Sequence, residues 1–265
     1  MTPIAVTIAG SDSGGGAGIQ ADLKTFSALG VYGASVIVAL TAQNTLGVQG
    51  VHEIPAEFVT QQIDSVFSDL AVGAVKIGMV ANVAAIEAVA SGLEKYAQRQ
   101  VVLDPVMIAA SGDRLLRADA MDALRRRLMP RARLATPNLH EAAALLDRPL
   151  ARNEAEMAEQ GRALLALGAP AILVKGGHGS GAESVDLLVT AQGVERFAAS
   201  RIDTSNSHGT GCTLSAAIAA GLARGLELRE AVSTGKDYVT AAIAASSRLR
   251  IGKGRGPTHH FHAWW

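Results

Sequence analysis

The chain of 265 residues is 49% hydrophobic and 18% charged, which excludes a disordered polypeptide. Its 24 Lys and Arg residues balance 24 Asp and Glu residues, so we expect no attraction to nucleic acid or to an anionic membrane. The single cysteine, Cys212, cannot form an internal disulfide. Residues 25–51 carry no charge, but their glycines and amides make a poor membrane span, and no targeting segment opens the chain. These features predict a cytoplasmic globular protein.

Short aliphatic runs alternate with longer segments of helical period, which is typical of a parallel sheet covered by helices on both faces. The predicted elements are, in chain order, strand 4–9, helix 17–29, strand 35–40, helix 56–69, strand 74–77, helix 83–97, strand 101–103, helix 118–127, strand 134–136, helices 140–146 and 154–167, and strand 171–174. A hairpin of 185–190 and 194–199 is predicted at the sheet edge, followed by helices 211–223 and 230–246. Without linkers or repeats, the prediction is one α/β domain over 1–265.

Polar residues follow six of these strands, at the edge of the sheet where open α/β folds bind ligands. The strand ends are Gly10-Ser11-Asp12, Gln43-Asn44, Gly78-Met79, Asp104-Pro105-Val106, Pro137-Asn138 and Lys175-Gly176-Gly177. Any one of them has a structural explanation, because turns are polar in general. Their convergence on one edge predicts a single ligand site.

The first of two glycine-rich segments is Gly14-Gly15-Gly16-Ala17-Gly18. It lacks the Gly-Lys-Ser/Thr ending of a P-loop and the spacing of a dinucleotide fingerprint, which disfavours a P-loop kinase and a standard Rossmann dehydrogenase. It is either a tight turn or a place where a ligand approaches the backbone closely.

The second segment, Asn206-Ser207-His208-Gly209-Thr210-Gly211-Cys212, leads into an apolar helix. Main-chain N–H groups at a helix start bind anions, so a phosphoryl group in transfer could be held there. The same field lowers the pKa of a thiol, which predicts that Cys212 ionises near neutrality and acts as a base or a nucleophile. The alternative is that Cys212 is a small buried hydrophobe.

Asp104, Asn138 and Glu141 supply the hard oxygen atoms that suit Mg²⁺. Asn138 and Glu141 also have the spacing of an N-cap and its capping-box partner, which the sequence alone favours. Lys175 precedes Gly176-Gly177-His178-Gly179, a segment that could cover a nucleotide; the alternative is a solvated lysine.

The C-terminal tail is rich in glycine and histidine. Its histidines lack a closed set of four metal ligands, so we do not expect a metal site. We expect Phe261, Trp264 and Trp265 to anchor the tail against the domain.

Taken together, these segments resemble one enzyme family, in its order and over nearly the whole chain. They are Ala9-Gly10-Ser11-Asp12-Ser13-Gly14-Gly15-Gly16-Ala17-Gly18 with 19–25, Ala42-Gln43-Asn44-Thr45, Lys76-Ile77-Gly78-Met79, Asp104-Pro105-Val106-Met107, Thr136-Pro137-Asn138-Leu139-His140-Glu141-Ala142, Lys175-Gly176-Gly177-His178, His208-Gly209-Thr210-Gly211-Cys212-Thr213 and the Gly-Pro…His-His-Phe tail. The sequence resembles the bacterial hydroxymethylpyrimidine/phosphomethylpyrimidine kinases of thiamine biosynthesis, in the ribokinase-like superfamily. Ser207 stands where threonine is common, and neither group is expected to bear the chemistry.

The resemblance implies a three-layer α/β/α ribokinase-like fold, usually dimeric, with a mostly parallel central sheet. It implies an enzyme that uses ATP and Mg²⁺ to phosphorylate 4-amino-5-hydroxymethyl-2-methylpyrimidine to its monophosphate and then to the diphosphate. The small-molecule pyrimidine is then the partner expected, together with a second copy of the chain.

The same resemblance implies roles for particular residues. Gln43 is implied to hydrogen-bond the aminopyrimidine edge, in a pocket that is lined by Gly10, Asp22, Met79 and Val106. The anion hole is implied to consist of Gly209, Thr210, Gly211 and Cys212, with Cys212 as the base where most of the superfamily has aspartate. Mg²⁺ and the phosphates are implied to be organised by Asp104, Asn138 and Glu141, with Lys175 near the ATP phosphates.

Three other functions stay open at this stage. A pyridoxal or pyridoxine kinase on the same scaffold also acts on a flat heteroaromatic ring with a hydroxymethyl group. A silent vitamin-binding or regulatory module is disfavoured because Asp104, Glu141 and Cys212 are intact and no DNA-binding segment is appended. A cysteine acyl-transfer enzyme would need a partner base, for which His208 is the only nearby candidate.

Overall fold

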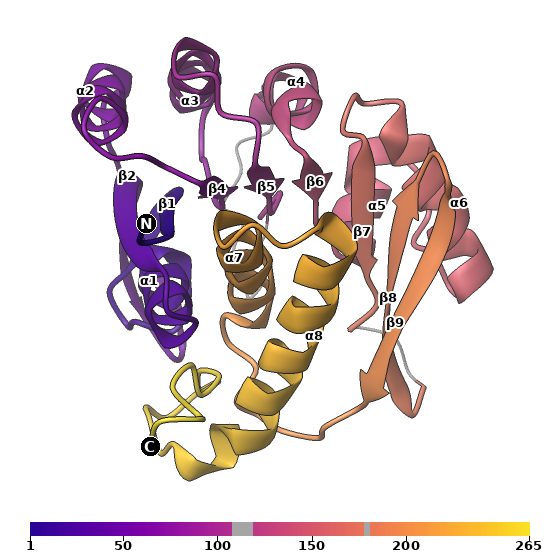
Figure 1. The fold of residues 1–265 in the computed structure, drawn as a ribbon. Helices are drawn as coiled ribbons and strands as arrows, with labels where there is room; N and C mark the ends of the chain where they lie inside the picture. Colours follow the sequence, from indigo (N-terminus) through magenta and orange to yellow (C-terminus); the bar gives the residue numbers. More distant parts are fainter. Residues whose placement is uncertain (108–118, 178–180) are drawn as a thin grey trace.

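The computed structural model of the protein describes residues 1–107, 119–177 and 181–265 (Figure 1). In this part of the chain, nine strands form one sheet in the order β3-β2-β1-β4-β5-β6-β7-β8-β9. The strands are β1 (Ile4–Asp12), β2 (Tyr32–Asn44), β3 (Gly47–Glu53), β4 (Ala74–Ile77), β5 (Val101–Leu103), β6 (Leu134–Ala135), β7 (Ala171–Lys175), β8 (Glu183–Thr190) and β9 (Gly193–Ser200). The sheet is parallel from β2 to β7, whereas β3, β8 and β9 pair antiparallel at its two edges.

Helices cover both faces of the sheet and give three layers (Figure 1). One face carries α1 (Gly18–Ala28), α7 (Thr210–Ala223) and α8 (Leu228–Ala244), and the other carries α2 (Ala56–Phe67), α3 (Val83–Lys95), α4 (Ala120–Ala123), α5 (Leu139–Leu146) and α6 (Glu154–Leu165). The three-layer α/β/α prediction is confirmed. No helix within the described ranges combines the length and the apolar character that a bilayer crossing requires.

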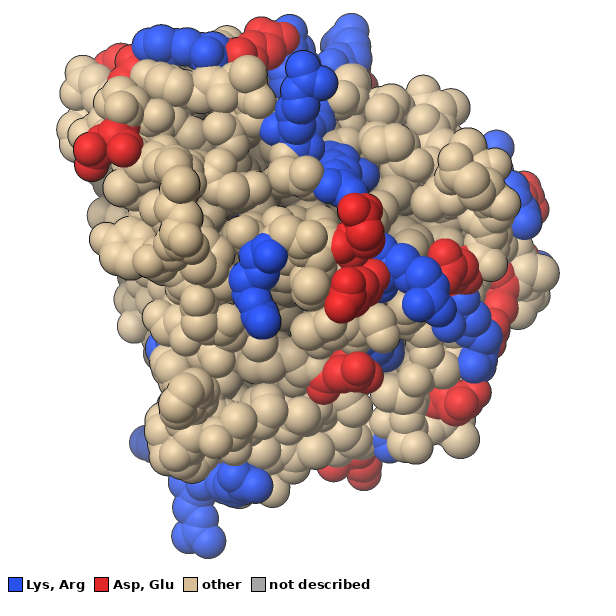
Figure 2. All heavy atoms as spheres, in the orientation of Figure 1, with Lys and Arg blue, Asp and Glu red and all other residues tan. Residues whose placement is uncertain are grey.

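The two layers of core follow from the alternation of side chains along each strand. In β1, Val6 and Ile8 pack in the core on the side of α2 and α3, whereas Ala5 packs on the side of α1 and α7. The strands are covered on both faces, so they are almost continuously aliphatic and short runs suffice to predict them. Acidic and basic side chains intermingle on the face shown in Figure 2, in keeping with their equal numbers.

Most predicted elements are found, with differences of a few residues at their ends, and the hairpin of β8 and β9 lies at the sheet edge as predicted. The sequence reasoning missed β3, an edge strand whose side chains are mostly exposed, so that it has no apolar face to reveal it. The helix predicted over 118–127 begins outside the described residues, and after α4 it continues as a π-helical turn, Leu124–Leu128. A short 3-10 helix, Met129–Arg131, follows; it contains Pro130, which lacks a main-chain N–H and so cannot donate the next helical hydrogen bond.

Candidate active site

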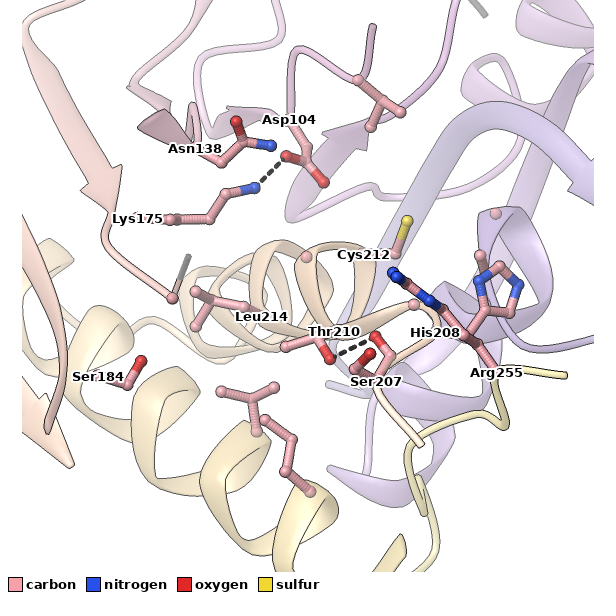
Figure 3. A pocket seen from close by; sticks show the side chains of 18 of the residues that line it. Asp104, Asn138, Lys175, Ser184, Ser207, His208, Thr210, Cys212, Leu214 and Arg255 are labelled. Carbon is pink, nitrogen blue, oxygen red and sulfur yellow. Dashed lines mark hydrogen bonds and ion pairs between the residues drawn. The ribbon is translucent and has the colours of Figure 1, made fainter. Parts of the chain in front are cut away.

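A cavity of about 810 Å³ opens at the carboxyl ends of the parallel strands (Figure 3). The predicted site residues in its wall are Gly10, Gln43, Met79, Asp104, Val106, Asn138, Glu141, Lys175, Gly209, Thr210, Gly211 and Cys212. All six predicted strand ends therefore contribute to one site. Asp22 is the exception, since it is not in the wall of this cavity.

Asp12 ends β1 and organises the first glycine-rich segment. The Gly14 N–H donates to its Oδ1 (2.8 Å), and the N–H groups of Gly16 (3.0 Å) and Ala17 (2.8 Å) donate to its Oδ2. His208 Nε2 lies 2.9 Å from the same Oδ2 and ties this turn to the segment before α7. Burial acts to raise the pKa of Asp12, but the hydrogen bonds from His208 and the main chain outweigh it and lower the pKa. The glycines thus form a tight turn around a side-chain carboxylate.

The N-terminus of α7, where the second glycine-rich segment predicts an anion site, lies in the cavity wall. Gly209 caps the helix with a φ of +80°, a conformation that favours glycine, and an added Cβ would collide with the Gly16 carbonyl. Gly211 in the first turn leaves space for the Lys175 ammonium, which would lie 3.2 Å from an added Cβ. The glycines therefore bring one lysine and a set of main-chain N–H groups to the same end of the cavity.

Cys212 lies in the first turn of α7 with its thiol directed into the cavity (Figure 3). Burial raises the pKa of this thiol to about 11, although the Lys76 ammonium and the Gly18 N–H act to lower it. The predicted near-neutral pKa is therefore wrong. The helix start does stabilise the thiolate, but the removal of water from the sulfur destabilises the thiolate by more than that.

The raised pKa predicts slow alkylation of the ligand-free enzyme by iodoacetamide at pH 7.5. A thiol of pKa about 11 stays protonated to a higher pH than an unperturbed cysteine of pKa about 8.5, and only the thiolate reacts. The rate of alkylation should therefore be below that of a small free thiol and should increase as the pH rises through 9 and 10. Mass spectrometry gives an unambiguous reading, because the chain contains one cysteine. Fast alkylation that does not change with pH above 7 would contradict the raised pKa.

Asp104 and Lys175 form a buried ion pair beside the start of α7. Lys175 Nζ donates to Asp104 Oδ1 (2.7 Å), and Ser215 Oγ donates to Oδ2 (3.2 Å). Burial acts to raise the pKa of Asp104, but the charges of Lys175 and Lys76 outweigh it, so the carboxylate is ionised. Lys175 is therefore a site residue rather than a solvated lysine.

Asn138 and Glu141 form the capping box of α5 that their spacing predicts. The Glu141 N–H donates to Asn138 Oδ1 (2.9 Å), and the Asn138 N–H donates to Glu141 Oε2 (2.7 Å). Burial raises the pKa of Glu141 to about 7, although Lys175, whose Nζ is 4.0 Å from Glu141 Oε2, acts to lower it. The cap holds the second carboxylate close to the Asp104–Lys175 pair.

The carboxylate oxygens of Asp104 and Glu141 could provide only some of the ligands that Mg²⁺ requires. Within the described ranges, no three His, Cys, Asp or Glu residues are grouped so that they could hold a metal ion by themselves. Asp104 and Glu141 provide two carboxylates on either side of Lys175. Such a pair suits an ion that is held mainly by water and substrate phosphates, as Mg²⁺ commonly is.

Asp22 and Lys76 form a second buried ion pair, behind the cavity wall. Both side chains are 0% exposed, and Lys76 Nζ donates to Asp22 Oδ2 (2.8 Å), which also accepts from Thr7 Oγ1 (2.6 Å). Lys76 reaches the cavity wall, whereas Asp22 does not. The implied contact of Asp22 with the substrate is therefore not supported by its position, because its side chain is fully buried outside the cavity wall and its Oδ2 is engaged by Lys76 and Thr7.

A third buried pair lies at the other end of the cavity. Lys236 of α8 donates to Asp186 Oδ2 (2.8 Å), and the Gly176 N–H donates to Asp186 Oδ1 (3.0 Å). This arrangement fixes the main chain directly after Lys175 and joins it to α8. Of the glycine-rich segment predicted here, His178 and Gly179 lie outside the described residues.

The tail is anchored mainly by residues other than those predicted. Trp264 and Trp265 are each 69% exposed, whereas Thr258, His259 and His260 are buried. The Tyr238 hydroxyl donates to the His260 carbonyl. The main anchor is therefore the buried polar residues that pack beside α7 and α8. Of the predicted aromatic residues, Phe261 is half-buried and the Trp265 ring lies against the His259 ring with a centroid distance of 4.6 Å.

Comparisons with known proteins identify the family of this chain. The model of the phosphomethylpyrimidine kinase family matches residues 12–259. The chain belongs to this family. Over 265 residues it is 62% identical to the hydroxymethylpyrimidine/phosphomethylpyrimidine kinase of Rhizobium meliloti (strain 1021), a match that covers 100% of this chain and 99% of that protein.

Solved structures of kinases are similar to this phosphomethylpyrimidine kinase family member over almost its whole length. An ADP complex of Bacillus subtilis pyridoxal kinase has a TM-score of 0.92 at 36% identity and covers 99% of both chains. The phosphomethylpyrimidine kinase of Clostridium difficile 630 has a TM-score of 0.81 at 45% identity and covers 91% of this chain and 99% of that one.

For this kinase family member, the sequence reasoning gave no role to Lys76, Asp12, Lys236 or Asp186. One feature of the sequence does point to Lys76: it is a charged residue in an otherwise aliphatic strand that is covered on both faces. Asp186 is a charged residue among the buried aliphatic residues of β8 and could have been noticed for the same reason. A buried charge requires a partner, so each could have been predicted to belong to a pair, although the partner could not be named.

Proposed function

We propose that the chain transfers the γ-phosphoryl group of ATP to the hydroxyl of 4-amino-5-hydroxymethyl-2-methylpyrimidine and then to the resulting monophosphate. The observation that carries the proposal is the arrangement of the cavity. Gln43 Nε2 lies 3.4 Å from His208 Nε2, and Cys212 in the first turn of α7 lies between His208 and the Asp104–Lys175 pair (Figure 3). The activity of the 62% identical kinase of Rhizobium meliloti (strain 1021) and the ADP complex of the similar Bacillus subtilis kinase support it.

Gln43 is suited to read the aminopyrimidine ring. Its Oε1 accepts a hydrogen bond from Thr41 Oγ1 (3.1 Å), which orients the amide. An oriented amide offers a donor and a remaining acceptor lone pair side by side, as the ring nitrogen and amino group of the substrate require. Gly10 leaves room for the Met79 side chain, because an added Cβ would collide with Met79 Cε, and Met79 and Val106 would give the ring an apolar surface.

The residues at the α7 start are suited to phosphoryl transfer, which depends mainly on positioning and charge stabilisation. Main-chain N–H groups of residues 209–212 would stabilise the charge on the transferred group. The thiolate of Cys212 would accept the proton of the substrate hydroxyl, late in the transfer, when this proton becomes acidic, so the small fraction of enzyme with Cys212 ionised at neutral pH would be the reactive one. Lys76, behind the thiol, stabilises the thiolate formed by ionisation of Cys212.

On the nucleotide side, Lys175 and Asn138 would lie at the ATP phosphates, with Asp104 and Glu141 as the residues that hold Mg²⁺. When bound, the ion would supply positive charge to the phosphate oxygens. Lys175 supplies a further cation, held in place by Asp104 and by the fixed main chain at Gly176.

We also propose a cytoplasmic homodimer, for which exposed Leu40, Leu46 and Val51 around β2 and β3 offer apolar surface.

An assay of ATP consumption with four acceptors tests the proposal: hydroxymethylpyrimidine, its monophosphate, pyridoxal and ribose. We expect turnover of the first two, with product analysis showing the monophosphate before the diphosphate. The similarity to pyridoxal kinase favours pyridoxal as the second candidate. A clear preference for pyridoxal over hydroxymethylpyrimidine would replace the proposed substrate, and ribose should not be used.

A further inference from the structure

The C-terminal segment next to the cavity is fixed from two sides. The Arg255 N–H donates to the Thr45 carbonyl (2.9 Å), in the turn between β2 and β3, two residues after Gln43. On the other side, the His208 N–H donates to the Gly256 carbonyl (3.0 Å), one residue before the α7 cap. Residue 255 is thus held between the end of the site assigned to the pyrimidine and the anion site.

Glycines make this close approach possible. Three of them leave no room for a side chain, because an added Cβ would collide with Thr45 or Asn206: Gly252, Gly254 and Gly256. Between them, Lys253 and Arg255 are the only residues with side chains. Of these two, only Arg255 contributes to the cavity wall.

Figure 3 shows where this side chain goes. The Arg255 side chain runs from the C-terminal segment into the cavity, beside His208 and toward Cys212. Its guanidinium is therefore at the acceptor end of the α7 N-terminus, whereas Lys175 is on the nucleotide side. A guanidinium presents a planar fork of N–H donors that matches two oxygens of a phosphate.

The second transfer makes a demand that the first does not. Its acceptor is a phosphate with a second pKa of about 6, so the acceptor group carries nearly two negative charges at neutral pH. These charges must approach the triphosphate of ATP, which repels them. A cation at the acceptor end would offset this repulsion.

The cavity wall holds other cations besides Arg255. Three buried lysines each face a buried carboxylate, in the pairs Lys76–Asp22, Lys175–Asp104 and Lys236–Asp186. The Arg201 side chain donates to the carbonyls of Gly177, Gly181 and Glu183, at the end of the cavity near β8. Arg255 differs from them in that it enters the acceptor end from the C-terminal segment, beside His208 (Figure 3).

We propose that Arg255 binds the phosphate of the pyrimidine monophosphate and thereby enables the second phosphoryl transfer. The inference rests on the proposed function. In this step the bond between the γ-phosphorus and the bridging oxygen of ATP breaks, a phosphate oxygen of the monophosphate bonds to that phosphorus, and ADP leaves. No proton is removed, because the attacking oxygen is already ionised. Arg255 holds this oxygen in line and offsets its charge.

The test compares Arg255→Gln, Arg255→Lys and the matched control Lys253→Gln, which removes a charge two residues away without touching the cavity wall. Each transfer is measured separately, starting from hydroxymethylpyrimidine or from purified monophosphate. In Arg255→Gln we expect kcat/KM of the second transfer to fall about 10- to 100-fold more than that of the first, the usual value of a charged hydrogen bond. Arg255→Lys should retain part of the second transfer, and Lys253→Gln should behave as the unmodified enzyme.

Calorimetry without ATP supplies an independent reading. The affinity of the monophosphate should fall about 10- to 100-fold in Arg255→Gln while the affinity of the unphosphorylated pyrimidine changes less. Equal losses in both transfers, or no loss in either, would overturn the inference. Failure of the unmodified enzyme to phosphorylate hydroxymethylpyrimidine at all would instead overturn the proposed function, so the two failures are distinguishable.

Discussion

Replacement of Cys212 by alanine should slow the first phosphoryl transfer about 10²–10⁴-fold, the usual contribution of a general base. The acceptor in this step is an alcohol, whose proton must leave as the new bond to phosphorus forms. The thiol is directed into the cavity at the α7 N-terminus, where the alcohol would lie (Figure 3). Binding of both substrates should largely survive, because the main-chain N–H groups of the anion site do not need the sulfur.

The second transfer should be much less sensitive to the same substitution. Its acceptor oxygen is already ionised at neutral pH, so it has no proton for Cys212 to remove. The ratio of the two rates therefore separates a base from a packing role, since damage to packing would slow both transfers alike. Together with Arg255, this assigns one residue to each acceptor: a thiol to the alcohol and a cation to the phosphate.

Two further variants sharpen the test. Cys212→Ser keeps the size of the side chain but provides a far weaker base, so it should resemble Cys212→Ala. Cys212→Asp places a carboxylate at the same position and should restore part of the first transfer. Near-normal first transfer in Cys212→Ala would show that the thiol only packs, and Asp104 or His208 would then be the candidates for the base.

The features that could be predicted from the sequence are those that local pattern determines. Parallel strands buried on both faces are mostly aliphatic, so β5 and, apart from Lys76, β4 can be predicted from the sequence with their observed ends. Polar residues that follow such strands must meet at one edge of the sheet, which is why Gln43, Asp104 and Lys175 were correctly expected in one cavity. Glycines at a helix start likewise predict an anion site without knowledge of the fold.

The remaining features depend on contacts between distant parts of the chain. Asp22 and Lys76 are 54 residues apart, and no local pattern shows that they meet. The pKa of Cys212 depends on how completely the surrounding layers exclude water, which a helix position alone does not reveal. Arg255 enters the site from the end of the chain, through a segment whose glycines alone give no indication of what they approach.

Lys76→Met should destabilise the folded protein by about 3–5 kcal/mol, the usual cost of breaking a buried ion pair by the removal of one partner. Methionine has a similar length and fills the space, so the loss is electrostatic. It leaves the Asp22 carboxylate with only the Thr7 hydroxyl, in a place from which water is excluded. Equilibrium unfolding in urea measures the change, and the exposed pair Lys95–Asp64 provides the control. Lys95→Met removes an ammonium at the comparable distance of 2.7 Å, yet should destabilise the protein far less because solvent screens that pair.

The cause can be separated from a general loss of packing in two ways. Burial already raises the pKa of Asp22, and loss of Lys76 raises it further, so the folded variant takes up a proton that the unfolded chain, with a pKa of about 3.9, does not. Stability of Lys76→Met relative to the unmodified protein should therefore recover as the pH falls from 7 toward 5, because the folded state then binds more protons than the unfolded state. The double variant Asp22→Asn with Lys76→Met should recover much of the loss at pH 7, because it removes both charges together. A cavity or a packing defect would show neither recovery. If stability stays low at every pH and in the double variant, Lys76 contributes through its packing rather than through its charge.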